Sequence, residues 1–259
     1  MTGQISTRPP WRLVAAPVTP LLRWAVLVHS VPAGEPWRRG CPHCEAPLLA
    51  AEGLGALGPA GRCGQCRRPA GAPPYLLEVT TIAVAALVAV GVVGAGSAGW
   101  PLWAAFALVG WAVAAVPLTF IDLAVHRLPD RFTLPAAGWV LGCLGISALA
   151  GGSGGDWLRA AAAAAVCGLG FATVTLLFGA RGFGLGDAKL AVSIGALLGW
   201  LGWTALVAGL LLAFLASGVV ALALLASKKV SRRDSLPFGP FLVLGTLGAV
   251  AWVGLSASA

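Results

Sequence analysis

The chain has 259 residues, of which 58% are hydrophobic and only 10% charged, with a formal net charge of +8. A soluble domain carries about 25% charged residues, so this composition argues against one. Lys and Arg in such an apolar chain are typical of cytoplasmic loops, and we expect no nucleic-acid partner. The composition predicts an all-α polytopic membrane protein in a lipid bilayer, with about eight transmembrane helices.

Apolar segments long enough to cross a hydrocarbon core of ~30 Å recur along the chain. The first, Trp11–Val31, is weak because Pro17, Pro20 and Arg23 interrupt it. It also lacks the clean apolar core and cleavage site of a targeting peptide, so we expect none. The four clear spans that follow are Leu76–Val93, Trp100–Ile121, Phe132–Leu149 and Trp157–Phe178.

A longer uncharged run, Leu190–Ala226, comes next and has 37 residues. As a single helix rising 1.5 Å per residue it would be about 55 Å long, which is too long for one crossing. We therefore expect it to turn back at "GWLGW", Gly199–Trp203, and to form two spans, of which the first is short. Phe238–Leu255 is the last expected span and brings the total to eight.

The basic residues follow this arrangement, because Lys and Arg collect in cytoplasmic loops. Thirteen of the 17 lie in four alternate loops, residues 32–74, 122–131, 179–189 and 227–237, whereas the loops between them hold only Arg159. These four loops are predicted to face the cytoplasm, and the alternation requires Leu190–Ala226 to cross twice. Arg8 and Arg12 fit the pattern poorly, which leaves the first span and its orientation open.

Loop 32–74 carries two C-x-x-C pairs, "CPHC" and "CGQC", separated by 18 residues. Each pair can present two thiolates from a tight turn, and four thiolates complete a tetrahedral zinc site: Cys41, Cys44, Cys63 and Cys66. Two disulfides or four unrelated thiols are the alternatives, but disulfides do not persist in a cytoplasmic loop. We expect structural Zn²⁺ with no open coordination position, although His43 could compete as a ligand.

This loop divides the chain into three expected parts. Residues 1–31 form an N-terminal segment with the weak first span, residues 32–74 form the cytoplasmic zinc loop, and residues 75–259 form a seven-span core.

Most of the nine acidic residues have a simple explanation as loop residues or at helix starts. Asp130 and Asp156 are predicted N-caps, and Glu78 favours the N-terminus of its span. Asp122 and Asp187 differ, because each lies directly against an apolar span. An ionisable group in that position is costly, so a functional role is the default hypothesis.

The predicted topology places Asp122 and Asp187 at the same membrane face. Two such carboxylates can share one proton, so that the ionised member activates a water while the protonated member polarises a peptide carbonyl. Gly184 and Gly186 would let an extended peptide approach the backbone. Alternatively, Asp187 is an N-cap after a flexible loop. Lys189 either stabilises the charge of Asp187 or is an ordinary cytoplasmic basic residue, and His126 either tunes the pair or lies at the interface.

Two segments resemble a known family. "GFGLGDAK" resembles the G-x-G-D signature of membrane aspartyl proteases, in the F-G-x-G-D-x-K form of bacterial prepilin peptidases, and "FIDLAVHRLPDRFTLP" is similar to that family's other motif. The cysteine loop and "PPYLLEVTT" resemble the family as well, so the likeness covers roughly residues 32–200. It implies that Asp122 and Asp187 are the catalytic pair and that Asp130 is only a neighbour. Separately from the resemblance, we expect Gly184, Gly186 and Lys189 to contact the substrate.

The resemblance implies a substrate, a location and a possible second activity. The substrate would be the leader of type IV pilin-like or type II secretion pseudopilin precursors, cut after a glycine at the cytoplasmic face of the inner membrane. Many members also methylate the new N-terminus with S-adenosylmethionine. Here "LLRWAVLVHSVPAGEP" and "EAPLLAAEGLGALGPAGR" match the family poorly, and no glycine-rich nucleotide fingerprint is visible, so methyl transfer, and with it the need for S-adenosylmethionine, stays open.

Two other functions remain as alternatives. One is a general intramembrane aspartyl protease that cuts the helices of other membrane proteins. The other is a small ion or solute transporter in which Asp122 and Asp187 bind ions. A transporter favours acidic groups near the bilayer midplane, whereas these two lie at the ends of their spans.

Overall fold

The computed structural model describes residues 19–32, 34–50, 54–179, 184–229 and 236–257. Within these ranges the fold is helical, apart from two isolated bridges, Gly40 with Pro47 and Arg62 with Pro69. A short 3-10 helix, η1, spans Leu54–Leu57. The α-helices are α2 (Thr19–His29), α3 (Leu76–Gly99), α4 (Leu102–Val125), α5 (Asp130–Gly151), α6 (Gly154–Phe178), α7 (Leu185–Leu201), α8 (Trp203–Ala226) and α9 (Gly239–Ala257).

The expected all-α polytopic architecture is confirmed. Six of the described helices, α3, α4, α5, α6, α8 and α9, are long and apolar enough to cross a membrane. Helix α7 has 17 residues, which corresponds to about 25 Å and agrees with the short span expected there. Helix α2 has 11 residues, and the first part of the expected span Trp11–Val31 lies outside the described residues.

The chain divides into two compact units, Met1–Thr81 and Ile82–Ala259. In the first unit a buried ion pair joins the start of α3 to α2: Arg23 Nε donates to Glu78 Oε1 and Arg23 Nη2 to Glu78 Oε2, both at 2.8 Å. The same guanidinium donates to the carbonyl oxygens of Pro59 at 2.8 Å and Ala72 at 3.1 Å. Because Arg23 and Glu78 are only 1% and 3% exposed, this network fixes the loop against both helices.

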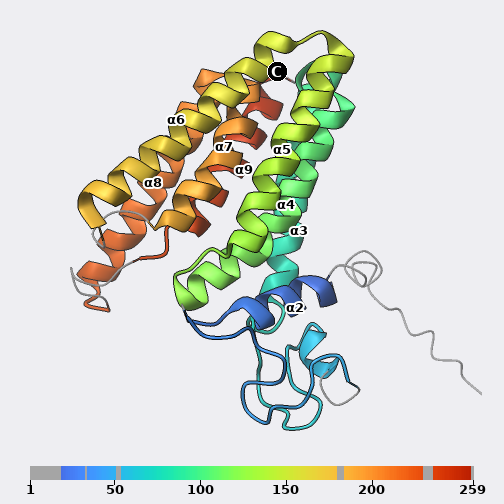
Figure 1. The fold of residues 1–259 in the computed structure, drawn as a ribbon, viewed down its shortest axis with the longest axis vertical. Helices are drawn as coiled ribbons and strands as arrows, with labels where there is room; N and C mark the ends of the chain where they lie inside the picture. Colours follow the sequence, from blue (N-terminus) through green and yellow to red (C-terminus); the bar gives the residue numbers. More distant parts are fainter. Residues whose placement is uncertain (1–18, 33, 51–53, 180–183, 230–235, 258–259) are drawn as a thin grey trace, which may run out of the picture. The chain divides into compact units, whose positions relative to one another are not determined.

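In the second unit, the helices run side by side and α7 contacts α4, α5, α6, α8 and α9 (Figure 1). Twelve of its 17 residues are buried. Two glycines on α7 permit close packing against the alanine-rich α6: a Cβ on Gly195 would lie 2.6 Å from the carbonyl oxygen of Ala163, and one on Gly199 would lie 3.1 Å from the Cα of Ala160. Small residues at such interfaces let helix backbones approach closely in membranes.

The turn expected at "GWLGW" is present, because α7 ends at Leu201 and α8 begins at Trp203. Gly202 between them has a φ of 127°, a conformation that side chains rarely allow. Arg159 from α6 donates through Nε to the carbonyl of Gly199 and through Nη2 to that of Trp200, both at 2.7 Å. The single basic residue of the intervening loops therefore caps the C-terminus of α7.

Two helix starts differ from the sequence prediction. Asp130 and Asp156 are not N-caps, because Pro129 and Ser153 occupy those positions. Asp130 is instead the first residue of α5, and Asp156 lies in the first turn of α6, 2.9 Å from Arg159 Nη2. The helix dipole favours a carboxylate anywhere in the first turn. An Asp near a helix start therefore does not show by itself whether it is the N-cap or one of the residues that follow.

Candidate active site and metal centre

Asp122 lies in the last turn of α4, where the helix ends because His126 adopts a left-handed conformation with a φ of 50°. Its side chain is only 5% exposed. The backbone N–H of Gly239, the first residue of α9, donates to Asp122 Oδ2 at 3.0 Å. This contact leaves the other carboxylate oxygen, Oδ1, available to the pocket described below.

Asp187 lies in the first turn of α7 and is 7% exposed. Its Oδ2 accepts a hydrogen bond from the backbone N–H of Gly184 at 2.9 Å. Gly184 is the N-cap residue, so Asp187 occupies the third helical position and reaches back to the helix start, as in a capping box. The alternative interpretation, in which Asp187 itself is the N-cap, is therefore wrong.

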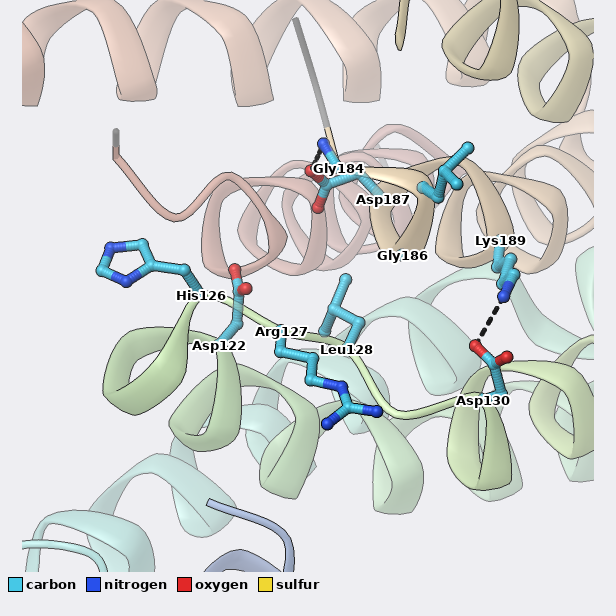
Figure 2. Close-up of a pocket in the computed structure, with 10 residues that line it drawn as sticks. Asp122, His126, Arg127, Leu128, Asp130, Gly184, Gly186, Asp187 and Lys189 are labelled. Carbon is cyan, nitrogen blue, oxygen red and sulfur yellow. Dashed lines mark hydrogen bonds and ion pairs between the residues drawn. The ribbon is translucent and has the colours of Figure 1, made fainter. Parts of the chain in front are cut away.

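Figure 2 shows the two carboxylates pointing toward each other across one pocket, Asp122 from the end of α4 and Asp187 from the start of α7. The pocket has a volume of about 270 Å³. Its other lining residues are His126, Arg127, Leu128, Asp130, Gly184, Leu185, Gly186 and Lys189. The two aspartates, 65 positions apart in the sequence, therefore line one pocket.

Two contacts hold the carboxylate-bearing segments close together. A Cβ on Gly186 would lie 2.8 Å from Leu128 Cβ, so the start of α7 can approach the 126–129 turn only with glycine there. Deeper in the bundle, Trp111 Nε1 of α4 donates to Ser193 Oγ of α7 at 3.0 Å, and both side chains are buried. Together these contacts set the separation of α4 and α7 near the pocket.

Gly184 differs from Gly186 in the space around it. A Cβ on Gly184 would meet Asp187 Oδ2 at 3.5 Å, which is ordinary contact. Its N–H donates to Asp187, and its carbonyl accepts from the N–H groups of Asp187 and Ala188. Both backbone groups of Gly184 are therefore engaged within the helix start.

Lys189 pairs with Asp130 and not with Asp187: Lys189 Nζ lies 2.6 Å from Asp130 Oδ1 at the rim of the pocket (Figure 2). The Lys189 side chain is partly exposed, at 36%, and the Asp130 side chain is largely exposed, at 59%. The His126 ring lies on the other side of the two carboxylates from this ion pair and points away from the Asp122 carboxylate (Figure 2). The pair of buried carboxylates is thus bordered by an ion pair that joins the starts of α5 and α7.

Sequence reasoning did not single out Gly239. The contact between Gly239 and Asp122 joins residues 117 positions apart. The available signal was the sequence "PFGP", Pro237–Pro240, where a glycine between two prolines opens an apolar span. It was a weak signal, because Gly and Pro are also common at ordinary helix starts.

The four loop cysteines form a second cluster. Cys41 Sγ lies 3.8 Å from Cys66 Sγ, Cys44 Sγ lies 3.7 Å from Cys63 Sγ, and all four sulfurs are within 4.8 Å of one another. None of the four forms a disulfide. Sulfurs placed 2.3 Å from a zinc ion at the corners of a tetrahedron are about 3.8 Å apart, so the donor set fits zinc.

The cluster is built from two turns of the same design. In one, the N–H of Glu45 donates to the carbonyl of Cys41, and in the other the N–H of Arg67 donates to that of Cys63, at 2.9 Å and 3.0 Å. Backbone N–H groups, first that of Cys66, lower the pKa of Cys63 to about 7, whereas burial and the neighbouring thiols raise the pKa of Cys44 to about 12. His43 Nε2 lies 3.1 Å from the carbonyl oxygen of Pro69, a contact outside the sulfur cluster.

Comparison with known proteins shows which family has a matching sequence. Residues 106–225, which include both buried carboxylates, match the type IV leader peptidase family. A "prepilin leader peptidase/N-methyltransferase" of Aeromonas hydrophila is 36% identical over 220 residues, which are 83% of this chain and 71% of that protein. The protein of the same name from Burkholderia pseudomallei (strain K96243) is 36% identical over 80% of this chain and 65% of its own length. No solved structure matches the chain.

The helical bundle and the family match define a multi-pass membrane peptidase. The chain belongs to the type IV leader peptidase family. The resemblance to bacterial prepilin peptidases inferred from the motifs is therefore confirmed.

Proposed function

We propose that this protein is a membrane-embedded aspartyl endopeptidase that removes the leader peptide of type IV pilin-like or type II secretion pseudopilin precursors at the cytoplasmic face of the inner membrane. The observation that carries the proposal is the pair Asp122 and Asp187, buried and facing each other across one pocket. The names of the relatives supply the substrate class.

The chemistry follows from the state of the two carboxylates. Each has one oxygen held by a backbone N–H, Asp122 by Gly239 and Asp187 by Gly184, and each keeps its other oxygen for water and substrate. Two buried like charges that face one pocket do not both ionise readily, so we propose that the pair holds one proton between them.

In the proposed reaction, the ionised carboxylate takes a proton from a water, and the water oxygen attacks the carbonyl carbon of the scissile peptide. The protonated carboxyl donates a hydrogen bond to the carbonyl oxygen, where negative charge develops. The tetrahedral intermediate collapses when its C–N bond breaks and a proton passes to the leaving nitrogen. The pair then holds one proton again, so the cycle closes.

The substrate would lie along the rim of the pocket, beside Gly184, Gly186 and Lys189. Because both backbone groups of Gly184 are engaged, we propose that glycine there gives the peptide room and does not bond to it. Lys189 offers charge, and its ion pair with Asp130 leaves the ammonium exposed enough to meet a substrate group.

We further propose that the four loop cysteines bind Zn²⁺ in a structural role. Four thiolates leave no coordination position for water or substrate, so the metal would stabilise the fold of residues 32–74. N-methylation of the new N-terminus, which would need S-adenosylmethionine, is a second candidate function, favoured by the names of the relatives.

Mass spectrometry of a prepilin co-expressed in a host without its own leader peptidase tests the proposal. We expect a product shortened at the glycine that ends the leader, and an added mass of one methyl group if methyl transfer is retained. The control is the same pilin helix without its charged leader. Cleavage of that control would favour the general intramembrane protease, and an uncut prepilin with the protein present in the membrane would refute the proposed function.

A further inference from the structure

The start of α9 contacts the candidate active site, although it lies outside both aspartate motifs. The N–H of Gly239 donates to Asp122 Oδ2 at 3.0 Å in a buried position. Of the groups in this first turn, Pro240 has no N–H, and the N–H groups of Phe241 and Leu242 donate to the carbonyl of Phe238. Gly239 therefore supplies the backbone donor that this turn does not use internally.

The position of Gly239 is fixed by the residue before it. The Phe238 ring packs against Phe214 of α8, with ring centroids 5.1 Å apart, and against Phe171 of α6, at 6.1 Å. Aromatic pairs at these separations add attraction beyond the area that they bury. The start of α9 is thus anchored to two neighbouring helices, and its N–H group is held at a defined place.

A side chain at Gly239 would collide with the Asp122 carboxylate. A Cβ there would lie 2.8 Å from Asp122 Oδ2 and 3.3 Å from Asp122 Cγ. The first distance is shorter than real Cβ contacts, so either the carboxylate or the start of α9 would have to move. Asp122 has little freedom to move, because its side chain is buried between helices.

We propose that Gly239 is a positioning residue for the reaction: its N–H holds Asp122 facing Asp187, and the missing Cβ is what allows that hydrogen bond. The "PFGP" segment is then a third functional element besides the two aspartate motifs. This inference rests on the proposed roles of Asp122 and Asp187.

The test compares Gly239→Ala with Gly218→Ala in a cleavage assay on purified prepilin. A Cβ on Gly218, within α8, meets nothing within 4 Å, so this control keeps the same chemical change without the contact. We expect Gly239→Ala to lower kcat about 100-fold with KM within about threefold, since misplacing a reacting group by about 1 Å has an effect of that order. Gly218→Ala should stay within about twofold of the wild type.

A second variant guards against misfolding of Gly239→Ala. Phe238→Leu loosens the aromatic anchor without adding an atom beside Asp122, and we expect about a tenfold lower kcat at unchanged KM. Wild-type kcat for either variant, with the protein at normal level in the membrane, would overturn the inference while leaving the proposed function intact.

A measurement without substrate separates the two proposals completely. The hydrophobic reagent dicyclohexylcarbodiimide modifies carboxyl groups in membrane proteins, and peptide mass spectrometry locates the product. In Gly239→Ala we expect labelling of Asp122, measured relative to labelling of Asp187, to rise at least severalfold. Unchanged Asp122 labelling would contradict the inference even if the protein cleaves no prepilin.

Discussion

Asp122 and Asp187 sit beside the N-termini of α9 and α7, which supply one backbone N–H to each carboxylate. A helix N-terminus carries a partial positive charge and favours an anion. Two N-termini facing a pair of buried carboxylates are therefore suited to one delocalised negative charge and one shared proton. This balance is what the proposed peptide hydrolysis requires, because base and acid must be present together.

The ion pair of Asp130 and Lys189 should contribute little to the chemistry itself. Asp130 is largely exposed and Lys189 partly so, and ion pairs open to solvent are worth about 0–1 kcal/mol. We expect Asp130→Asn to keep kcat/KM within about fivefold of the wild type in a prepilin cleavage assay. If Lys189 also meets substrate, Lys189→Gln should raise KM more than Asp130→Asn does. A well-expressed Asp130→Asn without activity would place Asp130 in the chemistry.

Among single residues, those whose charge is energetically unfavourable beside an apolar span could be predicted from the sequence. Residues whose roles depend on partners far along the chain could not. Asp122 and Asp187 attract notice because a carboxylate against an apolar span requires a reason. Gly239 and the pair Arg23–Glu78 do not, since their partners lie 117 and 55 residues away. No local pattern marks such contacts, and Arg23 was interpreted only as an interruption of an apolar segment.

Some predictions about turns and helix ends were likewise confirmed, and others were wrong. The turns that hold the cysteines could be predicted from the C-x-x-C spacing, because two thiolates three residues apart point to one side of a tight turn. The break between α7 and α8 could be predicted from length alone, since 37 apolar residues exceed one membrane crossing. The N-cap assignments of Asp130 and Asp156 were wrong, because Asp is common both at the N-cap and in the first turn of a helix.

Replacing Cys41 and Cys63 by Ser should release zinc and destabilise residues 32–74, because structural metal binding is coupled to folding. Metal analysis of purified protein should give about one equivalent of zinc for the wild type and for the control Cys143→Ala, whose thiol is buried within α5. A fully active wild type with less than about a tenth of an equivalent of zinc would refute the structural role.

The buried pair Arg23–Glu78 should govern the stability of the first unit. Arg23→Met leaves the Glu78 carboxylate buried without its partner, which costs roughly 3–5 kcal/mol. We expect a lower midpoint of thermal unfolding in detergent, and partial recovery in the double variant Arg23→Met/Glu78→Leu, in which neither charge remains. Equal midpoints for Arg23→Met and the wild type would show that the ion pair contributes nothing.

For the whole molecule, the turn between α7 and α8 decides the topology. With this turn, Asp122 at the end of α4 and Asp187 at the start of α7 lie at one end of the bundle, as the shared pocket requires. The basic loops are then expected to alternate across the membrane, and Arg159 is explained by its bonds to the end of α7. Arg181, Arg232 and Arg233, which support the same alternation, lie outside the described residues.

Accessibility of single cysteines tests this topology. In a background with Cys143 and Cys167 replaced by Ala, Arg127→Cys and Lys229→Cys should resist an impermeant thiol reagent in intact cells, because both loops are predicted to be cytoplasmic. Gly152→Cys, between α5 and α6, should react readily. The background protein without an added cysteine still contains the four zinc-loop thiols, and its labelling is the baseline. Equal labelling of the three variants would contradict the alternation.

The central claim is that Asp122 and Asp187 act as one catalytic unit, and cleavage of a co-expressed prepilin by aspartate variants tests it most directly. Asp→Asn keeps the shape and most of the hydrogen bonding but removes the ionisable proton. With equal protein levels in the membrane, we predict that Asp122→Asn and Asp187→Asn each abolish cleavage, and that the double variant is no worse than either, because members of a unit are not additive. Substantial processing by either single variant would contradict the account.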